Sequence, residues 1–171
     1  GSPDNKHPQA LAAQPVKDVA KIVAAIIRRV KPQVVVTFDP IGGYRHPDHI
    51  AIHLATVQAF SIAGEPSLVD ETNGLPPFTP SKLYYQTIQR GFLKLMVRVM
   101  PIFGKNPRKF GKNEDIDLAS IAEVDYPTDA VINYRWVADI RDDASACHVS
   151  QGGSKMSGGL FGRLRRFFGS K

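Results

Sequence analysis

The chain has 171 residues, and its 22 Lys and Arg residues outnumber 16 Asp and Glu residues, which gives a net charge of +6. With 43% hydrophobic residues, this composition predicts one soluble globular domain and excludes disordered, collagen-like and fibrous chains. A single cysteine excludes an intrachain disulfide and a four-cysteine zinc cluster, so a reducing, cytoplasmic setting is expected. The sequence has neither a secretory signal pattern at its start nor an apolar run of the roughly 18 residues that a membrane span requires.

The first predicted elements form half of an α/β unit. Apolar residues at offsets of three and four predict an amphipathic helix over residues 16–30. Residues 34–38 are a β-branched run without alternation, which predicts a strand buried on both faces. A glycine-bearing loop over 39–45 follows, and Pro47 suits the first turn of a second helix that runs to about Phe60. Ligands bind at such strand-to-helix loops in open α/β sheets.

The middle of the chain is less regular. Glycines and prolines between residues 61 and 81 predict a long surface loop. Residues 83–87 predict the next strand. The apolar and basic segment 92–103 is interpreted as a helix over the domain or a mobile lid, and the sequence does not decide between them.

The last part combines charged connections with a final helix. The basic segment 105–112 and the acidic segment 114–129 are interpreted as surface connections of opposite sign. A spacing of three and four predicts a helix over 133–148. Cys147, which lies among small apolar residues of that helix, is expected to be buried and inert rather than a nucleophile.

The most informative stretch runs from Asp39 to His49 and contains two histidines three residues apart. Both imidazoles can face the loop above the strand end, a geometry that suits a metal ion or an oxyanion. Asp48 is placed to fix the tautomer of a neighbouring histidine. The plainer interpretation is that His46 and Asp48 cap the helix while His49 packs. His53 shares a helix face with His49, a known metal spacing, although packing is the preferred interpretation for His53.

Glycines in the same loop allow its backbone to approach a ligand closely. Asp39 and Gly43 are therefore expected to line the substrate site. Asp39 follows the strand directly and is also a candidate metal ligand.

Residues 37–49, Thr-Phe-Asp-Pro-Ile-Gly-Gly-Tyr-Arg-His-Pro-Asp-His, resemble the second signature of the PIG-L or LmbE-like deacetylases. The Ala-Cys-His-Val-Ser-Gln run at 146–151 resembles the C-terminal motif of that family, and residues 1–11 resemble the segment before the first helix of bacterial members. The family consists of zinc-dependent N-deacetylases that act on N-acetylglucosaminyl groups. The resemblance implies a Rossmann-like α/β fold with a mostly parallel sheet and flanking helices.

The resemblance also implies a role for each matching residue. His49 would be a zinc ligand, and His46 would stabilise the oxyanion and act as the acid. Asp48 would orient His46, Tyr44 would move toward the substrate carbonyl, and His148 would close the pocket around the sugar. Arg45 replaces a glycine that is common between the tyrosine and the histidine, and its side chain is expected to point to solvent.

The first signature of the family, an Ala-His-Pro-Asp-Asp-Glu run, is absent from these 171 residues. In the family this run supplies a zinc histidine, a zinc aspartate and the general-base aspartate. The chain is therefore expected to be the C-terminal part of a deacetylase, an incomplete LmbE-like fold over residues 1–151. Its N-terminal region would be cut off, encoded separately as a partner chain, or lost. A non-catalytic remnant that binds sugar or a partner is the alternative.

Two surface features carry further expectations. Residues 152–171 form a basic tail whose apolar and arginine residues predict a short amphipathic helix, with packing on the domain favoured over contact with an anionic membrane. The other basic residues are dispersed without an aromatic-interleaved stripe, so nucleic acid is not an expected partner. A small N-acetylated amino-sugar conjugate is the expected substrate.

Overall fold

A computed structural model of the chain describes residues 7–68, 74–87, 90–111, 114, 116–124 and 126–149. The chain forms two compact units, residues 1–126 and residues 127–171. The described residues include no helix that is long and apolar enough to cross a membrane. The predicted boundary at residue 151 and the basic tail lie outside the described residues.

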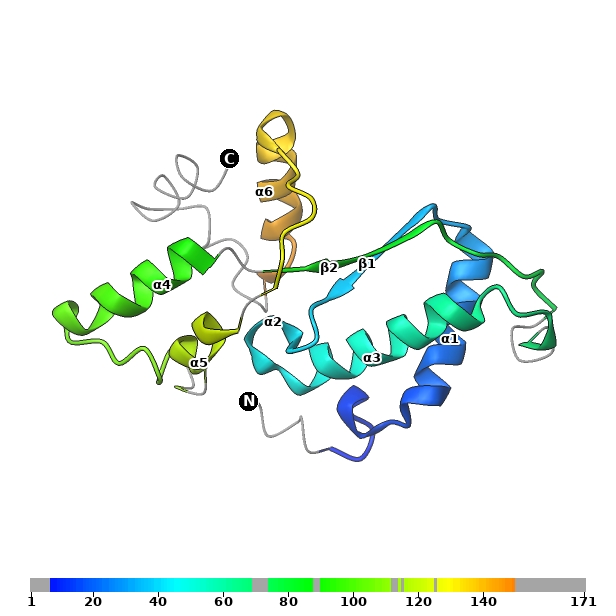
Figure 1. The fold of residues 1–171 in the computed structure, drawn as a ribbon, viewed down its shortest axis with the longest axis horizontal. Coiled ribbons are helices and arrows are strands. Elements are labelled where there is room, and N and C mark those ends of the chain that lie inside the picture. Colours follow the sequence, from blue (N-terminus) through cyan, green and yellow to red (C-terminus); the bar gives the residue numbers. More distant parts are fainter. Residues whose placement is uncertain are drawn as a thin grey trace. The chain divides into compact units, whose positions relative to one another are not determined.

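The first unit is built on a parallel strand–helix–strand arrangement. Strand β1 (Val34–Phe38) pairs in parallel with β2 (Lys82–Gln86), with Val34 opposite Lys82 and Phe38 opposite Gln86. Helix α3 (Pro47–Ile62) connects them, and α1 (Val16–Val30) packs on α3 (Figure 1). The predicted fold class is confirmed: the unit is an α/β structure with a small parallel sheet and flanking helices, as in part of a Rossmann-like fold.

Helices α1 and α3 meet through small residues, which lets their backbones approach closely. The buried cluster between them is made of the following residues: Ala20, Ala24, Ile27, Ala55, Ala59 and Ala63. The predicted helix over 16–30 is confirmed with the same bounds. Ile26 and Val30, which the apolar spacing assigns to the same stripe, are exposed instead. Together with Ile22 they form a second apolar stripe, at offsets of four, on another face of α1.

Strand β1 is covered on only one of its faces by the described residues, so the prediction of a strand buried on both faces is wrong. Val35 packs against the cluster between α1 and α3, and Thr37 is buried. Val34 and Val36 are exposed, because successive side chains of a strand point to opposite faces. We call the side with Val34 and Val36 the open face of the sheet.

The predicted loop between α3 and β2 contains a short 3-10 turn, Pro66–Leu68, and is held by a buried arginine. Arg28 of α1 is 1% exposed and donates hydrogen bonds to the carbonyl oxygens of Ala63, Glu65 and Leu75. Ala63 is the C-cap of α3, so the guanidinium binds carbonyls where a helix end leaves them without partners. The sequence places Arg28 on the polar side of α1, and this structural role was not predicted.

The segment 92–103 forms helix α4 (Arg90–Val99) and a 3-10 turn, η5 (Met100–Phe103). It packs against α5 (Leu118–Glu123), so of the two interpretations left open the structure shows a packed helix. Their shared core consists of the following residues: Leu93, Met100, Leu118, Ile121 and Ala122. The sequence predicts only an acidic connection where α5 lies. Asp117 caps this helix by accepting a hydrogen bond from the main-chain N–H of Ser120 at 3.0 Å.

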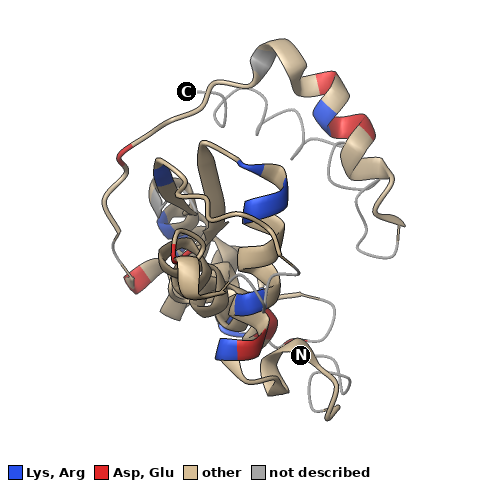
Figure 2. Cartoon of the chain, turned by 90° about the vertical axis from the view of Figure 1, so that its right-hand side faces the viewer, with Lys and Arg blue, Asp and Glu red and all other residues tan. Residues whose placement is uncertain are grey.

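The second unit contains a short 3-10 turn, Arg135–Val137, and helix α6 (Ala138–Ala146), so the predicted helix is confirmed in its centre. None of the described α6 side chains is buried, and Trp136 is 94% exposed. Three aspartates and one arginine lie along this helix (Figure 2). The prediction that Cys147 is buried is wrong, since the thiol is exposed beside the C-terminal turn of a helix that nothing described in its unit covers.

Candidate functional site

The site lies in the loop between β1 and α3, and its shape depends on Asp39. This carboxylate is 3% exposed, and it accepts a hydrogen bond from the main-chain N–H of Gly43 at 2.7 Å. The main-chain carbonyl of Asp39 accepts a second bond from Gly42 at 2.9 Å. The loop thereby folds into the short turn α2 (Gly42–Arg45). Asp39 stabilises the loop, and its predicted contact with substrate stays a prediction.

Gly42 lets this turn lie directly against α3. Its φ is +65°, and a Cβ there would lie 2.9 Å from the Cβ of His49 and from two atoms of Ile50. Gly43 has a φ of +70° but has space around it, with nothing within 4 Å of the position that a Cβ would take. The two glycines therefore serve different ends, since one allows close packing and the other only the backbone conformation.

His49, in the first turn of α3, is fixed on two sides. Its ring stacks on Phe38 with a centroid distance of 3.8 Å, and its Nδ1 lies 3.2 Å from the carbonyl oxygen of Gly42. A carbonyl only accepts, so Nδ1 carries the proton and Nε2 keeps a free electron pair. Burial lowers the pKa of His49 below its usual range, and the nearby His46 adds to this effect. A neutral imidazole with a free Nε2 is the form that binds a metal ion.

His46 has the opposite tautomer preference. It is the N-cap of α3, and its Nδ1 accepts a hydrogen bond from the main-chain N–H of Asp48 at 3.2 Å. Because Nδ1 accepts, the proton of the neutral ring lies on Nε2, which becomes a hydrogen-bond donor. The plainer interpretation of His46 as a helix cap is therefore correct, and the cap also leaves a donor available on the other ring nitrogen.

The rings of Tyr44, His46 and His49 lie close together. The ring centroids of His46 and His49 are 4.7 Å apart, and the Tyr44 ring lies edge-on to them at 5.6 and 5.2 Å. The carboxyl end of β1 therefore carries a nitrogen that can bind a metal ion (His49), a ring N–H donor (His46) and a phenol (Tyr44). This arrangement offers one nitrogen ligand and hydrogen-bond donors for an oxygen beside it.

Asp48 uses a different contact from the predicted one. Its carboxylate accepts a hydrogen bond from the main-chain N–H of Ala12 at 2.9 Å, while its own main-chain N–H meets His46. The carboxylate thus ties the short 3-10 turn Leu11–Ala13 to the start of α3. Orientation of His46 by the Asp48 carboxylate stays a prediction.

His53 packs, as preferred from the sequence. It is 6% exposed, its Nδ1 lies 2.7 Å from the carbonyl oxygen of Phe38, and its ring lies edge-on to Tyr85 of β2. His53 lies one helical turn after His49 and connects α3 to both strands. The side chain is thus engaged with the backbone of β1 and with a side chain of β2.

Arg45 is exposed but not free in solvent. Its φ is +66°, an unusual value for a residue other than glycine, and its Nε donates to Oγ of Ser120 at 3.3 Å. Ser120 belongs to α5, so this bond links the loop that carries His46 to the α4–α5 pair. Neither Ser120 nor the link was predicted, since no local pattern indicates a contact across 75 residues.

The C-terminal motif of the resemblance, residues 146–151, belongs to the second unit. His148 is exposed, and its main-chain N–H donates to the carbonyl of Ser145 at 3.1 Å. Residues 150 and 151 of the C-terminal motif, and residues 1–5 of the opening segment, lie outside the described residues. The predicted role of His148 at the sugar pocket therefore stays a prediction.

The donors present fit part of a zinc site. His49 offers an oriented Nε2, whose ring is held by a carbonyl on the other nitrogen, as is usual for histidine ligands. Within the described ranges, no group of three or more His, Cys, Asp and Glu side chains could hold a metal ion. Catalytic zinc usually takes three protein ligands, so the described part supplies one well-oriented ligand and not a complete set.

Fold and site together define an α/β protein with a histidine site at the carboxyl end of its parallel strands. Residues 2–60 match the family model described as PIG-L, GlcNAc-PI de-N-acetylase. The match covers α1, β1 and the whole Tyr44–His46–His49 cluster. The resemblance stated from the sequence is confirmed for this part of the chain, whose residues 2–60 match the PIG-L family model.

Curated relatives agree with this family. A protein of Geodermatophilus obscurus is 30% identical over 151 residues, which are 88% of this chain and 50% of the relative. A Rhodococcus erythropolis protein is 32% identical over 151 residues, 88% of this chain and 49% of the relative. A Thermobifida fusca protein is 46% identical over 84 residues, 49% of this chain and 28% of the relative. Each is named a 1D-myo-inositol 2-acetamido-2-deoxy-alpha-D-glucopyranoside deacetylase, and the chain spans at most about half of their length.

Proposed function

We propose that this chain carries the second half of the active site of a zinc-dependent N-deacetylase. The substrate class is a small conjugate of N-acetylglucosamine, in line with the names of the relatives. The reaction is hydrolysis of an acetamide to an amine and acetate. The observation that carries the proposal is the contact that each Nδ1 makes: a carbonyl oxygen for His49 and a main-chain N–H for His46, with ring centroids 4.7 Å apart. We infer from these contacts that Nε2 is an acceptor on His49 and a donor on His46.

Each residue of the cluster has a distinct task in this proposal. His49 would hold the zinc ion through Nε2. A zinc ion in such a site polarises the substrate carbonyl and activates water when it is bound. His46 would donate its Nε2–H to the oxygen of the acetamide as negative charge develops there. The departing amine would receive the proton that the general base has taken from water. Tyr44 is the second donor toward that oxygen, and Gly43 lets the backbone lie close to the substrate.

The other zinc ligands and the general base would come from outside these 171 residues. No His-Pro-Asp-Asp run is present in the sequence, and the described side chains offer no set of three ligands. Two exposed apolar surfaces support the proposal that another segment packs on this chain: the open face of the sheet and the exposed stripe of α1. A further strand and helix of the same α/β layer arrangement would cover them. The cytoplasmic location stays a prediction from composition.

Acetate release by three samples tests the proposal. The samples are the chain with zinc, the chain joined to the N-terminal half of the Geodermatophilus obscurus relative, and that joined protein with His49→Ala. We expect turnover by the second sample alone. Turnover by the chain itself would show that Asp39 or Asp48 fills the missing role, and turnover by the third would remove His49 from the metal site.

A further variant separates the donor from the ligand. In the joined protein, His46→Ala should lower kcat by about 10² to 10³ with zinc content unchanged, as is typical for loss of one oxyanion donor. Loss of zinc in this variant would make His46 a ligand instead. If all joined proteins bind the amino sugar without turnover, the alternative of a non-catalytic sugar-binding remnant is correct.

A further inference from the structure

The charge of the chain is unevenly distributed. Residues 72–113 contain no Asp or Glu, and they carry eight of the 22 Lys and Arg residues. The eight are Lys82, Arg90, Lys94, Arg98, Lys105, Arg108, Lys109 and Lys112. Among the described acidic side chains that follow this segment, Asp117 pairs with Arg108 at 2.9 Å, and Glu114 and Glu123 are exposed. A strong positive charge therefore remains on α4 and the turn that follows it.

Helix α4 has two apolar faces, and the core that the described residues form uses one of them. Leu93 and Met100 are buried against α5, with Met96 and Val97 beside them. Residues 92, 95, 99 and 102 follow at offsets of three and four and define another face. On this face Phe92 is 45%, Leu95 59% and Ile102 78% exposed.

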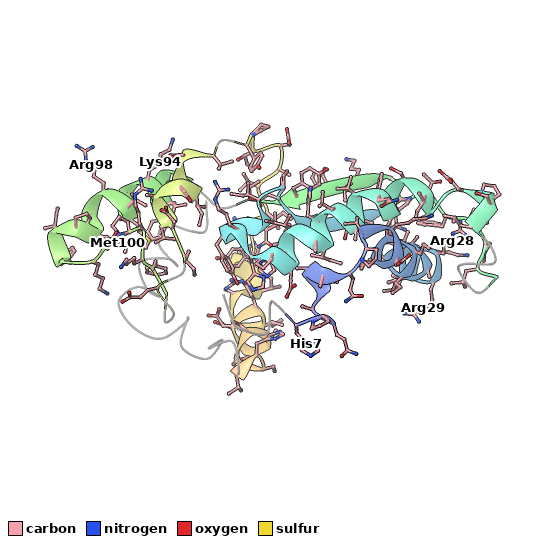
Figure 3. The ribbon with its side chains drawn as sticks, turned by 90° about the horizontal axis from the view of Figure 1, so that it is seen from below. His7, Arg28, Arg29, Lys94, Arg98 and Met100 are labelled. Atoms are coloured by element: carbon pink, nitrogen blue, oxygen red, sulfur yellow. The ribbon has the colours of Figure 1, made fainter. Side chains whose placement is uncertain are left out.

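The exposed face continues into η5 and is bordered by cations. Phe103 of η5 is 74% exposed. Lys94 and Arg98 are one helical turn apart, and they extend from the same side of α4 (Figure 3). We call Phe92, Leu95, Ile102 and Phe103, with Lys94 and Arg98 at their border, the α4–η5 surface. An exposed apolar patch of this kind marks a binding surface.

We propose that the α4–η5 surface docks on an anionic phospholipid membrane. Phenylalanine, leucine and isoleucine beside lysine and arginine are the composition of helices that lie in a membrane interface, with the apolar face below the headgroups and the cations among them. No described helix can span a bilayer, so this attachment is peripheral. A nucleic acid would neutralise the cations but would leave the aliphatic side chains in water. The docking surface is independent of the proposed catalytic function.

Vesicle co-sedimentation of the full chain tests this proposal. The vesicles are phosphatidylcholine alone and phosphatidylcholine with phosphatidylserine, each at low and at high salt. We expect retention on the anionic vesicles only, weakened by salt. The variant Ile102→Ser/Phe103→Ser and the variant Lys94→Glu/Arg98→Glu should each reduce the partition coefficient by about tenfold or more. Circular dichroism checks that each variant keeps the fold, which is expected because all four side chains are exposed.

The matched control is Lys17→Glu/Arg29→Glu on α1, which makes the same change of charge at two exposed positions. This control should bind vesicles within about twofold of the unmodified chain. Four results would overturn the proposal: no retention on anionic vesicles, equal retention on neutral vesicles, an equal loss in the control, or retention that both α4–η5 variants leave intact. Binding to RNA without retention on vesicles would assign the cations to a nucleic acid instead.

Discussion

At Gly42 the backbone of the site loop lies closer to α3 than any side chain allows. Three atoms of His49 and Ile50 lie 2.9 Å from the position that a Cβ would take. The same contact places the Gly42 carbonyl at 3.2 Å from Nδ1 of His49. The close approach of Gly42 to α3 therefore also brings its carbonyl to the His49 ring, and a larger side chain at position 42 would disturb both the packing and this hydrogen bond.

Gly42→Ala should therefore destabilise the chain by about 2–5 kcal/mol, the sum of a positive φ and an overpacked contact. Gly43→Ala is the matched control, because it has the same sign of φ but no neighbour within 4 Å, and it should cost only about 1–2 kcal/mol. Urea unfolding of both variants measures the difference. Equal losses would show that the loop moves away from α3 at little cost.

Much of the site at this scale could be predicted from sequence because it is local. Tyr44, His46 and His49 are within six residues, and the turn α2 followed directly by the start of α3 brings them together. The contacts that sequence reasoning missed join distant segments. The Asp48 carboxylate meets Ala12, and Arg45 meets Ser120. No periodicity or motif specifies such pairs, since they depend on how the elements pack.

At the scale of elements, Arg28 joins the end of α3 to the loop before β2. Arg28→Met keeps a long apolar stem but leaves the carbonyls of Ala63, Glu65 and Leu75 without this donor, and we expect a loss of about 2–4 kcal/mol. Arg29→Met is the control, because Arg29 is exposed and points away from Arg28 (Figure 3), and it should change stability by less than about 0.5 kcal/mol. Thermal unfolding compares the two. Equal effects would mean that water replaces the guanidinium without cost.

The cap of α5 gives this element a pH dependence. The main-chain N–H of Ser120 holds the pKa of Asp117 below its usual range, and Arg108 contributes in the same direction. The native state therefore favours the charged carboxylate. Its stabilisation is complete above the ordinary carboxyl pKa of about 4 and is lost as the pH falls through the lower native value.

Amide exchange at Ser120 should accordingly lose its protection in acid, and Asp117→Ala should remove that protection at neutral pH as well. Glu123→Gln removes one charge from the same helix without touching the cap, so it serves as the control. Protection in Asp117→Ala that equals that of the unmodified chain would exclude the carboxylate as the cap.

Periodicity predicted the long elements and failed for the short one. The centres of α1, β1, α3 and β2 agree with their predicted ranges, because each has a continuous apolar pattern. Helix α5 has six residues and lies in an acidic stretch that resembles a surface connection. Its signals are the Asp117 cap and the spacing of Leu118, Ile121 and Ala122, which become clear only once α4 is known to pack there.

At the scale of the whole molecule, the patterns of α1 and β1 predict more burial than the described residues provide. Val34 and Val36 read as core residues of a sheet covered on both faces, and Ile22, Ile26 and Val30 make an apolar stripe on α1. Whether a side chain is buried depends on the neighbouring layer, and the sequence of one strand or helix does not show whether that layer is present. These residues are where the α/β arrangement expects a further strand or helix.

A charged substitution on the open face of the sheet tests whether a further layer covers it. If a segment supplied from outside these 171 residues covers it, Val36→Asp should weaken association with a separately produced N-terminal half of the Geodermatophilus obscurus relative by about tenfold or more, because a charge would be buried. The variant chain itself should keep its stability, since Val36 is 63% exposed. Calorimetric titration measures the affinity. Ile102→Asp, at 78% exposure on the α4–η5 surface, is the control and should bind that half normally. Unchanged affinity for Val36→Asp would show that the open face is not where the two halves of the active site meet.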